Sequence, residues 1–112
     1  MATDPDSILS VTTTVGADED ARRLAGAALE RRLAACVQVD RIESHYRWDG
    51  ALQAAAEWRL TFKTTAARLP ALRELLRQEH PYDLPQLTWH ACDASPGYAA
   101  WVRQEVAGLT DD

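Results

Sequence analysis

The sequence predicts an α+β fold in which two helices cover one face of a four-stranded antiparallel sheet. First, stretches of alternating or β-branched apolar residues and stretches with apolar residues three and four apart follow one another in the order β, α, β, β, α, β, with one short helix added at the C-terminal end. Second, an Asp-Gly pair, which is typical of tight hairpins, separates the second strand from the third. This order is that of the ferredoxin-like βαββαβ sandwich, and 112 residues fit a single domain.

The first strand and the first helix follow from local sequence. The β-branched run ILSVTTTV predicts a strand over residues 8–15, and Gly16 then begins a turn. A helix is predicted over about residues 17–35, because acidic residues occupy its first turn and arginines lie near its end. Its apolar face consists of side chains at helical spacing: Ala21, Leu24, Ala25, Ala28 and Leu29.

A long hairpin follows this helix. The second strand is predicted from Cys36 to Trp48, but its apolar side chains change from odd positions, such as Val37 and Val39, to even positions, such as Ile42. We expect a β-bulge at the Asp-Arg pair between them, because a bulge reverses the faces of the residues that follow it.

The third strand alternates cleanly. Trp58, Leu60 and Phe62 point to one face, and Glu57 and Lys63 point to the other. Glu57 is a candidate for a polar cleft, but its position favours a solvated or cross-strand paired side chain.

A second helix is predicted to follow Thr64 and Thr65, which are expected to cap it, and to end near Glu79. Pro70 leaves its first residue open. The helix is expected to bury its leucines, Leu69, Leu72, Leu75 and Leu76.

The segment EHPYDLPQ ends this helix. His80 closes the helix as a C-terminal cap, Pro81 stops it, and Pro85 leads into a fourth strand over residues 86–92. The run SPGYAAWVRQEV then predicts a last short helix after its Ser-Pro pair.

Composition limits the classes of partner. The net charge of −5 argues against nucleic acid, which proteins normally contact with a basic surface. No apolar run approaches the roughly 20 residues of a membrane helix, and the acidic start MATDPDS does not resemble an export signal, so we expect a cytoplasmic protein. The two cysteines are expected to be reduced thiols. Residues 1–7 and 107–112 are expected to be flexible tails of a single domain that spans residues 1–112.

The predicted strands of the hairpin are longer than the helices that cover the sheet. Strands of about 12 residues extend roughly 40 Å, whereas a 14-residue helix covers about 21 Å. The hairpin should therefore project beyond the helices and carry Tyr46, Trp48 and Trp58 with it. Because exposed aromatic patches of this kind are unusual in monomers, we expect the chain to self-associate through the hairpin.

Local motifs for catalysis are missing. Asp18, Glu19 and Asp20 occupy the turn after the first strand, where their charges would repel a phosphate. The sequence also contains no nucleophile elbow and no HExxH motif. An enzyme is therefore the weakest of the functional hypotheses.

Histidine and cysteine side chains are the more interesting candidates. The donors suited to copper or zinc are not spaced as a local chelate, so a metal site would have to be assembled across the fold. His90 and Cys92 share a face of the fourth strand. Each candidate also has a simpler explanation, since Cys36 can be a small buried apolar residue and His80 a helix cap.

Several separated motifs, in order, suggest a family. RLAACVQV, SHYRWDG, EWRLTFKTT, HPYDLPQL and GYAAWV closely resemble the CutA divalent-cation tolerance proteins, over residues 8 to about 106. The resemblance implies a ferredoxin-like subunit in a tight homotrimer whose long hairpins pair between subunits. It also implies tolerance to copper and other divalent ions, without an established catalytic activity.

The resemblance implies roles for individual residues. The cysteine of the family's AACV motif falls on Cys36 and the histidine of its HPY motif on His80, which makes these the likeliest metal donors. The additional donors that we consider are His90, Cys92 and Asp83.

The family's YxW motif falls on Tyr46 and Trp48. Together with Trp58, these side chains are predicted to form the trimer interface.

The chain departs from the family pattern at several positions. Gln38 replaces a common asparagine, and Asp83 and Gln86 replace glutamates of HPYEVPE, which removes a possible anionic ligand at position 86. The fourth strand carries Trp89, His90 and Cys92 in place of an aliphatic run.

The leading hypothesis is therefore a homotrimer that binds or responds to copper or another divalent cation, with no organic cofactor and no enzymatic activity. The alternative is a PII-like signalling or scaffold trimer that binds a small anion or a protein partner at its inter-subunit cleft.

Overall fold

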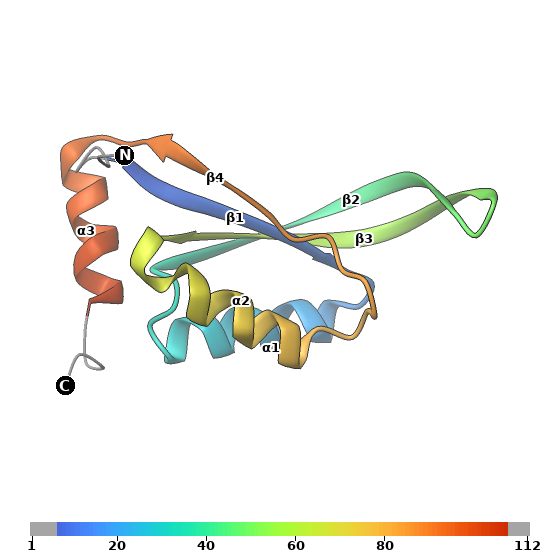
Figure 1. Cartoon of the computed structure of the whole chain (residues 1–112), viewed down its shortest axis with the longest axis horizontal. Coiled ribbons are helices and arrows are strands. Elements are labelled where there is room, and N and C mark those ends of the chain that lie inside the picture. The colour runs from blue at the N-terminus through green and yellow to red at the C-terminus, as the bar shows by residue number, and fades with distance from the viewer. Residues whose placement is uncertain (1–6, 108–112) are drawn as a thin grey trace.

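A four-stranded antiparallel sheet with the strand order β2-β3-β1-β4 organises the computed structural model, which describes residues 7–107 (Figure 1). The α+β, ferredoxin-like arrangement predicted from the sequence is confirmed. The strands are β1 (Ser7–Val15), β2 (Cys36–Trp48), β3 (Ala51–Thr64) and β4 (Thr88–Asp93). The helices are α1 (Asp18–Glu30), the 3₁₀ turn η1 (Ala66–Arg68), α2 (Leu69–Glu79) and α3 (Pro96–Val106).

The two expected tails fall mainly on residues 1–6 and 108–112, which lie outside the described residues. At their inner ends, Ser7 is the first residue of β1 and Ala107 follows α3. Within the described part of the chain, no helix is long and apolar enough to cross a membrane.

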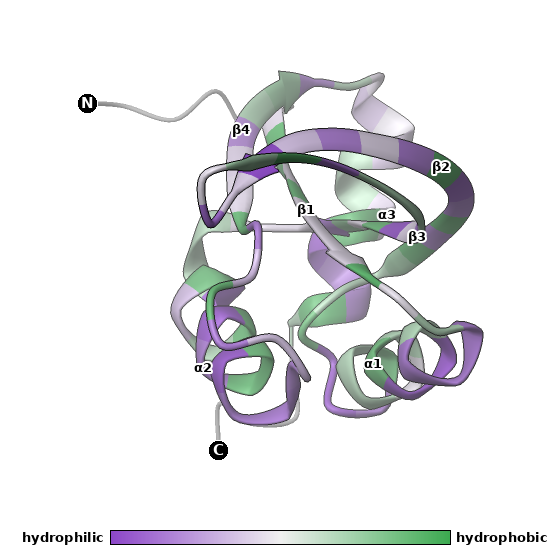
Figure 2. Cartoon of the chain, turned by 90° about the vertical axis from the view of Figure 1, so that its right-hand side faces the viewer, coloured by the Kyte–Doolittle hydropathy of each residue, from purple (hydrophilic) through white to green (hydrophobic). Residues whose placement is uncertain are grey.

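α1 and α2 lie beside each other and cover one face of the sheet (Figure 2). The core lies between the helices and the sheet. Its fully buried side chains come from β1, α1, β3 and α2 and include Val11, Leu24, Leu60, Phe62 and Leu72. Burying each of these aliphatic or aromatic side chains contributes about 1.5–3 kcal/mol to folding. The helical periodicity of α1 and α2 and the alternation in β3 therefore identify the core face correctly.

α1 is shorter than predicted. It ends at Glu30, and Arg32 adopts a left-handed conformation with φ of 55°, while the amide of Leu33 donates to the carbonyl of Ala28 at 2.8 Å. This hydrogen-bond pattern is typical of a helix C-terminus. Leu29, which was expected in the core, is 43% exposed because it lies at the edge of the apolar face.

The start of α2 also differs from the prediction. Neither Thr64 nor Thr65 caps it: the Thr64 hydroxyl donates to the Leu33 carbonyl at 2.7 Å, and Thr65 makes no side-chain cap bond. The 3₁₀ turn η1 comes first, and Pro70 lies in the first turn of α2, where its missing N–H leaves no helix bond unmade.

The predicted bulge in β2 is wrong. β2 and β3 pair in one continuous register from Cys36 opposite Lys63 to Trp48 opposite Ala51. The apolar residues of β2 change from one face to the other because the helices cover only the first part of the strand. At Val39, which is 43% exposed, the helices no longer cover the odd face, so the later apolar side chains occupy the even face of a regular strand.

The hairpin projects beyond the helices, as the strand lengths predicted (Figure 1). The described chain measures 45 × 25 × 23 Å, and its radius of gyration is 14.9 Å, compared with about 13 Å for a compact domain of this length. At the opposite end, α3 packs against β1 through Ala99, Val102 and Ile8.

Candidate functional site

The turn over residues 80–86 connects α2 to β4 and lies near the base of the overhanging hairpin (Figure 1). Hydrogen bonds fix it at both ends. At its start, Arg23 of α1 donates to the Glu79 side chain at 2.8 Å and to the Glu79 carbonyl at 3.0 Å. At its end, the Thr13 hydroxyl of β1 donates to the Gln86 carbonyl at 2.6 Å. The turn is thus fixed against α1 and β1, which belong to the rigid core.

His80 is the C-cap of α2, as the sequence predicted, and its backbone amide donates to the Leu76 carbonyl at 2.9 Å. Its imidazole is bonded on both sides. The Tyr82 amide donates to Nδ1 at 3.1 Å, so Nδ1 accepts and the proton lies on Nε2, which donates to the Thr14 carbonyl at 2.9 Å. The second contact of Nε2 is the Thr13 hydroxyl at 3.1 Å. His80 therefore joins the turn to β1 as a neutral imidazole.

Glu57 lies at the centre of the second part of this network. Its residue is only 9% exposed, and its two carboxylate oxygens accept hydrogen bonds from the Ser44 hydroxyl at 2.7 Å and the Tyr82 hydroxyl at 2.8 Å. Gly16 leaves room for that tyrosine, because a Cβ there would lie 3.1 Å from the Tyr82 oxygen. The expectation of a solvated Glu57 is wrong, because the turn over residues 80–86 covers it, whereas cross-strand pairing is confirmed by its bond to Ser44 of β2.

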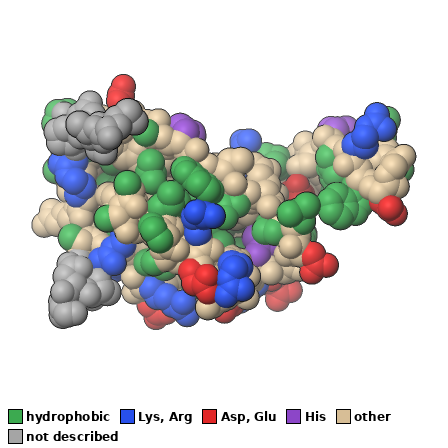
Figure 3. All heavy atoms as spheres, in the orientation of Figure 1, with side chains coloured by type: hydrophobic (Ala, Val, Ile, Leu, Met, Phe, Trp, Pro, Cys, Tyr) green, Lys and Arg blue, Asp and Glu red, His purple; other side chains and the backbone are tan. Residues whose placement is uncertain are grey.

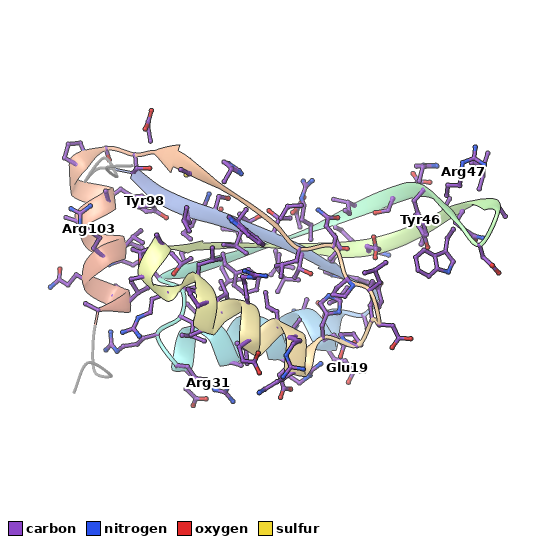
Figure 4. All side chains as sticks on the ribbon, viewed as in Figure 1. Glu19, Arg31, Tyr46, Arg47, Tyr98 and Arg103 are labelled. Carbon is purple, nitrogen blue, oxygen red and sulfur yellow. The ribbon has the colours of Figure 1, made fainter. Side chains whose placement is uncertain are left out.

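A cavity of about 560 Å³ opens beside Glu57, between the hairpin and the turn. Ser44, Tyr46 and Trp48 lie two residues apart on β2, so they share a face of the hairpin, while Tyr82 forms the opposite wall. Figure 4 shows Tyr46 on the part of the hairpin that extends past the helices, and Figure 3 shows hydrophobic side chains along the underside of this extension. The other lining residues are Thr14, His45, Asp83, Leu84 and Gln86.

The burial of this region shifts two pKa values. Burial, followed by the hydrogen bond to Glu57, raises the pKa of Tyr82 above its usual value, so this tyrosine donates as a neutral hydroxyl. Burial lowers the pKa of His80, and the hydrogen bond to the Thr14 carbonyl opposes that shift only in part. Within the described residues, the buried carboxylate of Glu57 therefore accepts hydrogen bonds from neutral hydroxyl groups only, those of Ser44 and Tyr82.

A second cavity of about 440 Å³ lies on the other side of Tyr82, between α2 and the turn. Arg73 and Arg77 of α2 contribute to it, but Arg77 is bound to Glu74 at 2.6 Å and the Arg73 guanidinium lies over the Trp89 ring at 4.7 Å. The two arginines of this cavity therefore already interact with a carboxylate and with an aromatic ring.

A single chain does not bring Cys36 and His80 together. Cys36 lies opposite Lys63, which lies opposite Ser10, whereas His80 bonds to Thr13. The two sites are about 10 Å apart along β1 alone, and they lie on opposite faces of the sheet because Ser10 and Thr13 differ in parity.

Cys36 instead lies near α3. Burial, followed by the proximity of Cys36 and Cys92, raises the pKa of Tyr98 on that helix. Both cysteines are free and half-buried.

The additional metal-donor candidates are also separated. His90 and Cys92 share a face of β4, as predicted, opposite Ser10 and Ile8 of β1, and Asp83 lies in the exposed turn. Over residues 7–107, no three side chains of His, Cys, Asp and Glu gather closely enough to hold a metal ion.

The aromatic residues assigned to the trimer interface fall into two groups. Tyr46 and Trp48 are 45% and 56% exposed on the overhang. Trp58 points to the opposite face, packs against the core and carries the Arg41 guanidinium 4.9 Å above its ring.

Sequence reasoning missed the link between Glu57 and Tyr82. The signal lay in the register of the hairpin, which places Ser44 and Glu57 diagonally across one face, whereas the contribution of Tyr82 depends on tertiary packing.

Comparison with known proteins gives consistent matches. Residues 9–105 match the family model described as CutA1 divalent ion tolerance protein. The chain is similar to Protein CutA of Mus musculus, with 33% identity over 109 residues that cover 96% of this chain and 62% of the mouse protein. It therefore spans about three fifths of that relative's length. It is also similar to the divalent-cation tolerance protein CutA of Thermus thermophilus, with 38% identity over 98 residues that cover 86% of this chain and 95% of the relative.

Among solved structures, CutA from Synechococcus elongatus superimposes with a TM-score of 0.87 at 38% identity, over 91% of this chain and 92% of the other. The family model covers nearly all of the described sheet and helices. This chain therefore belongs to the CutA1 divalent ion tolerance protein family.

Proposed function

We propose that this chain binds or responds to copper and other divalent ions as a cytoplasmic homotrimer, without catalysing a reaction and without an organic cofactor. The observation that carries the proposal is the match of residues 9–105 to a family described by divalent ion tolerance. The thiol of Cys36 and the imidazole of His80 support it, because soft and borderline donors of this kind suit copper and zinc.

The described residues of one chain do not fit a complete metal site. They contain no group of three suitable donors, and both imidazole nitrogens of His80 are engaged in hydrogen bonds. A metal ion at His80 would have to displace one of these bonds. The proposal therefore places the site between subunits, and the position of Cys36 on the edge strand β2, where another chain can approach, supports this arrangement.

The test is calorimetric titration of the fully reduced protein with Cu(I) under argon and, separately, with Zn(II). We expect binding that weakens by at least about tenfold in Cys36→Ser and in His80→Ala, because each substitution removes a ligand. His45→Ala is the matched control, since His45 is an exposed histidine on the hairpin. Unchanged affinity in both donor variants would refute the assignment of these residues.

The alternative is a signalling or scaffold trimer that takes a small anion or a protein partner between its subunits. One observation favours the anion: Lys63 and Arg59 lie on the face of β3 that α1 and α2 do not cover, although Arg59 is bound to Asp40 at 2.8 Å. Titration with inorganic phosphate, repeated on Lys63→Met, tests it. An affinity that does not change in the variant would count against a site at this face.

A further inference from the structure

A row of four side chains crosses the face of the sheet that α1 and α2 leave open (Figure 2). Cys36 of β2 pairs with Lys63 of β3, and Lys63 pairs with Ser10 of β1. On its other side, Ser10 pairs with His90 of β4. Residues directly opposite each other in antiparallel strands share a face, and their Cβ atoms lie about 4.5–5.5 Å apart. The register therefore places the hydroxyl of Ser10 between a lysine and a histidine.

Ser10 is the most buried member of this row. It is only 5% exposed, yet its hydroxyl makes no hydrogen bond to any other described residue. Ser10 lines an open cavity of about 540 Å³ on this face of the sheet, a volume within the range of small-molecule sites. Buried hydroxyl groups are normally hydrogen-bonded, because an unmade bond is unfavourable. The Ser10 hydroxyl is therefore suited to bind a ligand in this cavity.

The charges on this face favour a negative ligand. Lys63, the one lysine of the sequence, is partly buried and forms no ion pair with a carboxylate of residues 7–107. Asp40 is the one carboxylate among the described residues that line the cavity, and Arg59 binds both of its oxygens, at 3.2 and 2.8 Å. The charge of Asp40 is thus compensated, whereas the charge of Lys63 is not.

The hydroxyl groups of a second row indicate the shape of the anion. Thr12 of β1 pairs with Thr61 on one side and with Thr88 on the other, and all three line the cavity beside Ser10. Each hydroxyl can donate one hydrogen bond. A planar carboxylate presents two oxygens, whereas a tetrahedral phosphate group has oxygens for donors in both rows and a charge that a lysine ammonium compensates well.

We propose that this cavity binds a dianionic phosphate group, that of inorganic phosphate or of a phosphate monoester. Lys63 compensates its charge, and Ser10 and His90 donate hydrogen bonds to its oxygens. The inference rests on the alternative function proposed above, an anion at this face, and it specifies the chemical class and the donors. The row uses the start of β2, whereas Tyr46 and Trp48, through which we expect the chain to associate, lie near the other end of that strand.

The first experiment compares anions on the unmodified protein at slightly alkaline pH, where phosphate is mainly a dianion. Inorganic phosphate, glycerol 3-phosphate and chloride are each titrated to about 20 mM at constant ionic strength while ¹H–¹⁵N spectra are recorded. We expect saturable shifts at Ser10, Thr61 and Lys63 with both phosphates and none with chloride. Tighter binding of the ester would support an organic phosphate as the ligand, and tighter binding of phosphate itself would support the inorganic ion.

The second experiment uses two matched pairs of variants. Ser10→Ala removes the proposed donor, and Ser7→Ala removes a hydroxyl from the other face of the same strand. Lys63→Met removes the proposed charge, and Arg47→Met removes a charge from the overhanging hairpin (Figure 4). We expect the affinity for phosphate to fall at least about tenfold in Ser10→Ala and in Lys63→Met, and to change less than twofold in the two controls.

Thermal unfolding distinguishes a binding role of Ser10 from a structural one. Because its hydroxyl bonds no other described residue, Ser10→Ala should not lower the melting temperature in chloride. Phosphate should raise the melting temperature of the unmodified protein, since it binds the folded state, and this rise should be smaller in Ser10→Ala. A loss of stability in chloride with an unchanged rise in phosphate would overturn the assignment of Ser10.

The other outcomes separate this inference from the function on which it rests. If Lys63→Met weakens phosphate binding and Ser10→Ala does not, an anion still binds at this face, but the site proposed here is refuted. If neither variant changes the affinity, both the site and the alternative function fail. The absence of saturable shifts with either phosphate, as would follow if a neighbouring copy covered this face, overturns the proposal as well.

Discussion

At the scale of single residues, Tyr82 connects the turn to the hairpin through one hydroxyl. That hydroxyl donates to Glu57 at 2.8 Å, and a hydrogen bond to a carboxylate is worth more than a neutral one. We predict that Tyr82→Phe lowers the free energy of unfolding by about 1–2 kcal/mol, measured by guanidinium denaturation at a fixed protein concentration. In a double-mutant cycle with Glu57→Ala the two losses should not add, because each substitution removes one partner of the same bond. Full additivity would contradict a direct Tyr82–Glu57 interaction.

The pKa of His80 makes stability depend on pH. Burial holds this pKa below the usual 6.5, so the unfolded chain binds a proton more readily than the folded chain. The contribution of His80 is therefore complete above pH 6.5 and is lost as the pH falls below that value towards the folded-state pKa. We predict that His80→Gln flattens the fall in melting temperature between pH 6.5 and 5, at fixed protein concentration. His45→Gln, at an exposed histidine, should leave the slope unchanged; an unchanged slope in His80→Gln would exclude this role.

At the scale of elements, two glycines should respond oppositely to alanine. Gly50 closes the hairpin with φ of +77°, a conformation that an alanine adopts only with strain, although a Cβ there meets no atom within 4 Å. Gly26 lies inside α1 and also has free space around it. We predict that Gly50→Ala destabilises the protein by about 1 kcal/mol and that Gly26→Ala stabilises it by about 0.5–1 kcal/mol, measured by denaturant titration. Changes of the same sign would show that packing, rather than backbone conformation, decides the result.

How far the sequence predicts an element depends on what covers it. In β3 the alternation of Leu60 and Phe62 corresponds directly to burial, because one layer of helices lies over one face. In β2 the same rule failed, because the cover changes along the strand. Local pattern could not show that Val39 lies beyond the helices, so a change of surroundings was interpreted as a bulge.

The candidate site shows the same limit. Local sequence was enough to identify His80 as a helix cap, since the cap depends on neighbouring residues and on the proline after it. The burial of Glu57 depends on Tyr82, which follows it by 25 residues, and on the angle at which the turn meets the hairpin. Such a contact arises only when the whole sheet and α2 are in place.

At the scale of the whole molecule, the overhanging part of the hairpin leaves large apolar side chains exposed in the single chain. Trp48 and Leu52 are 56% and 76% exposed on the overhang, and β2 is an edge strand, which pairs with β3 alone among the described strands. Exposed aromatic surface beside an open sheet edge favours association with another copy. If the hairpin lies against another copy of the chain, that contact removes this apolar surface from water and explains why the hairpin projects from the rest of the fold.

Native mass spectrometry of the unmodified protein at micromolar concentration should therefore detect three chains, as proposed above for the assembly. We predict that Trp48→Ser raises the concentration at which the assembly dissociates by at least about tenfold, because interface tryptophans contribute strongly to binding. Leu29→Ser is the matched control, since Leu29 is 43% exposed on α1, in the helix layer away from the hairpin, and its loss should leave dissociation unchanged. Detection of the unmodified protein as a monomer would contradict association through the overhanging hairpin. A trimer that tolerates Trp48→Ser as well as Leu29→Ser would instead move the interface away from this face of the hairpin.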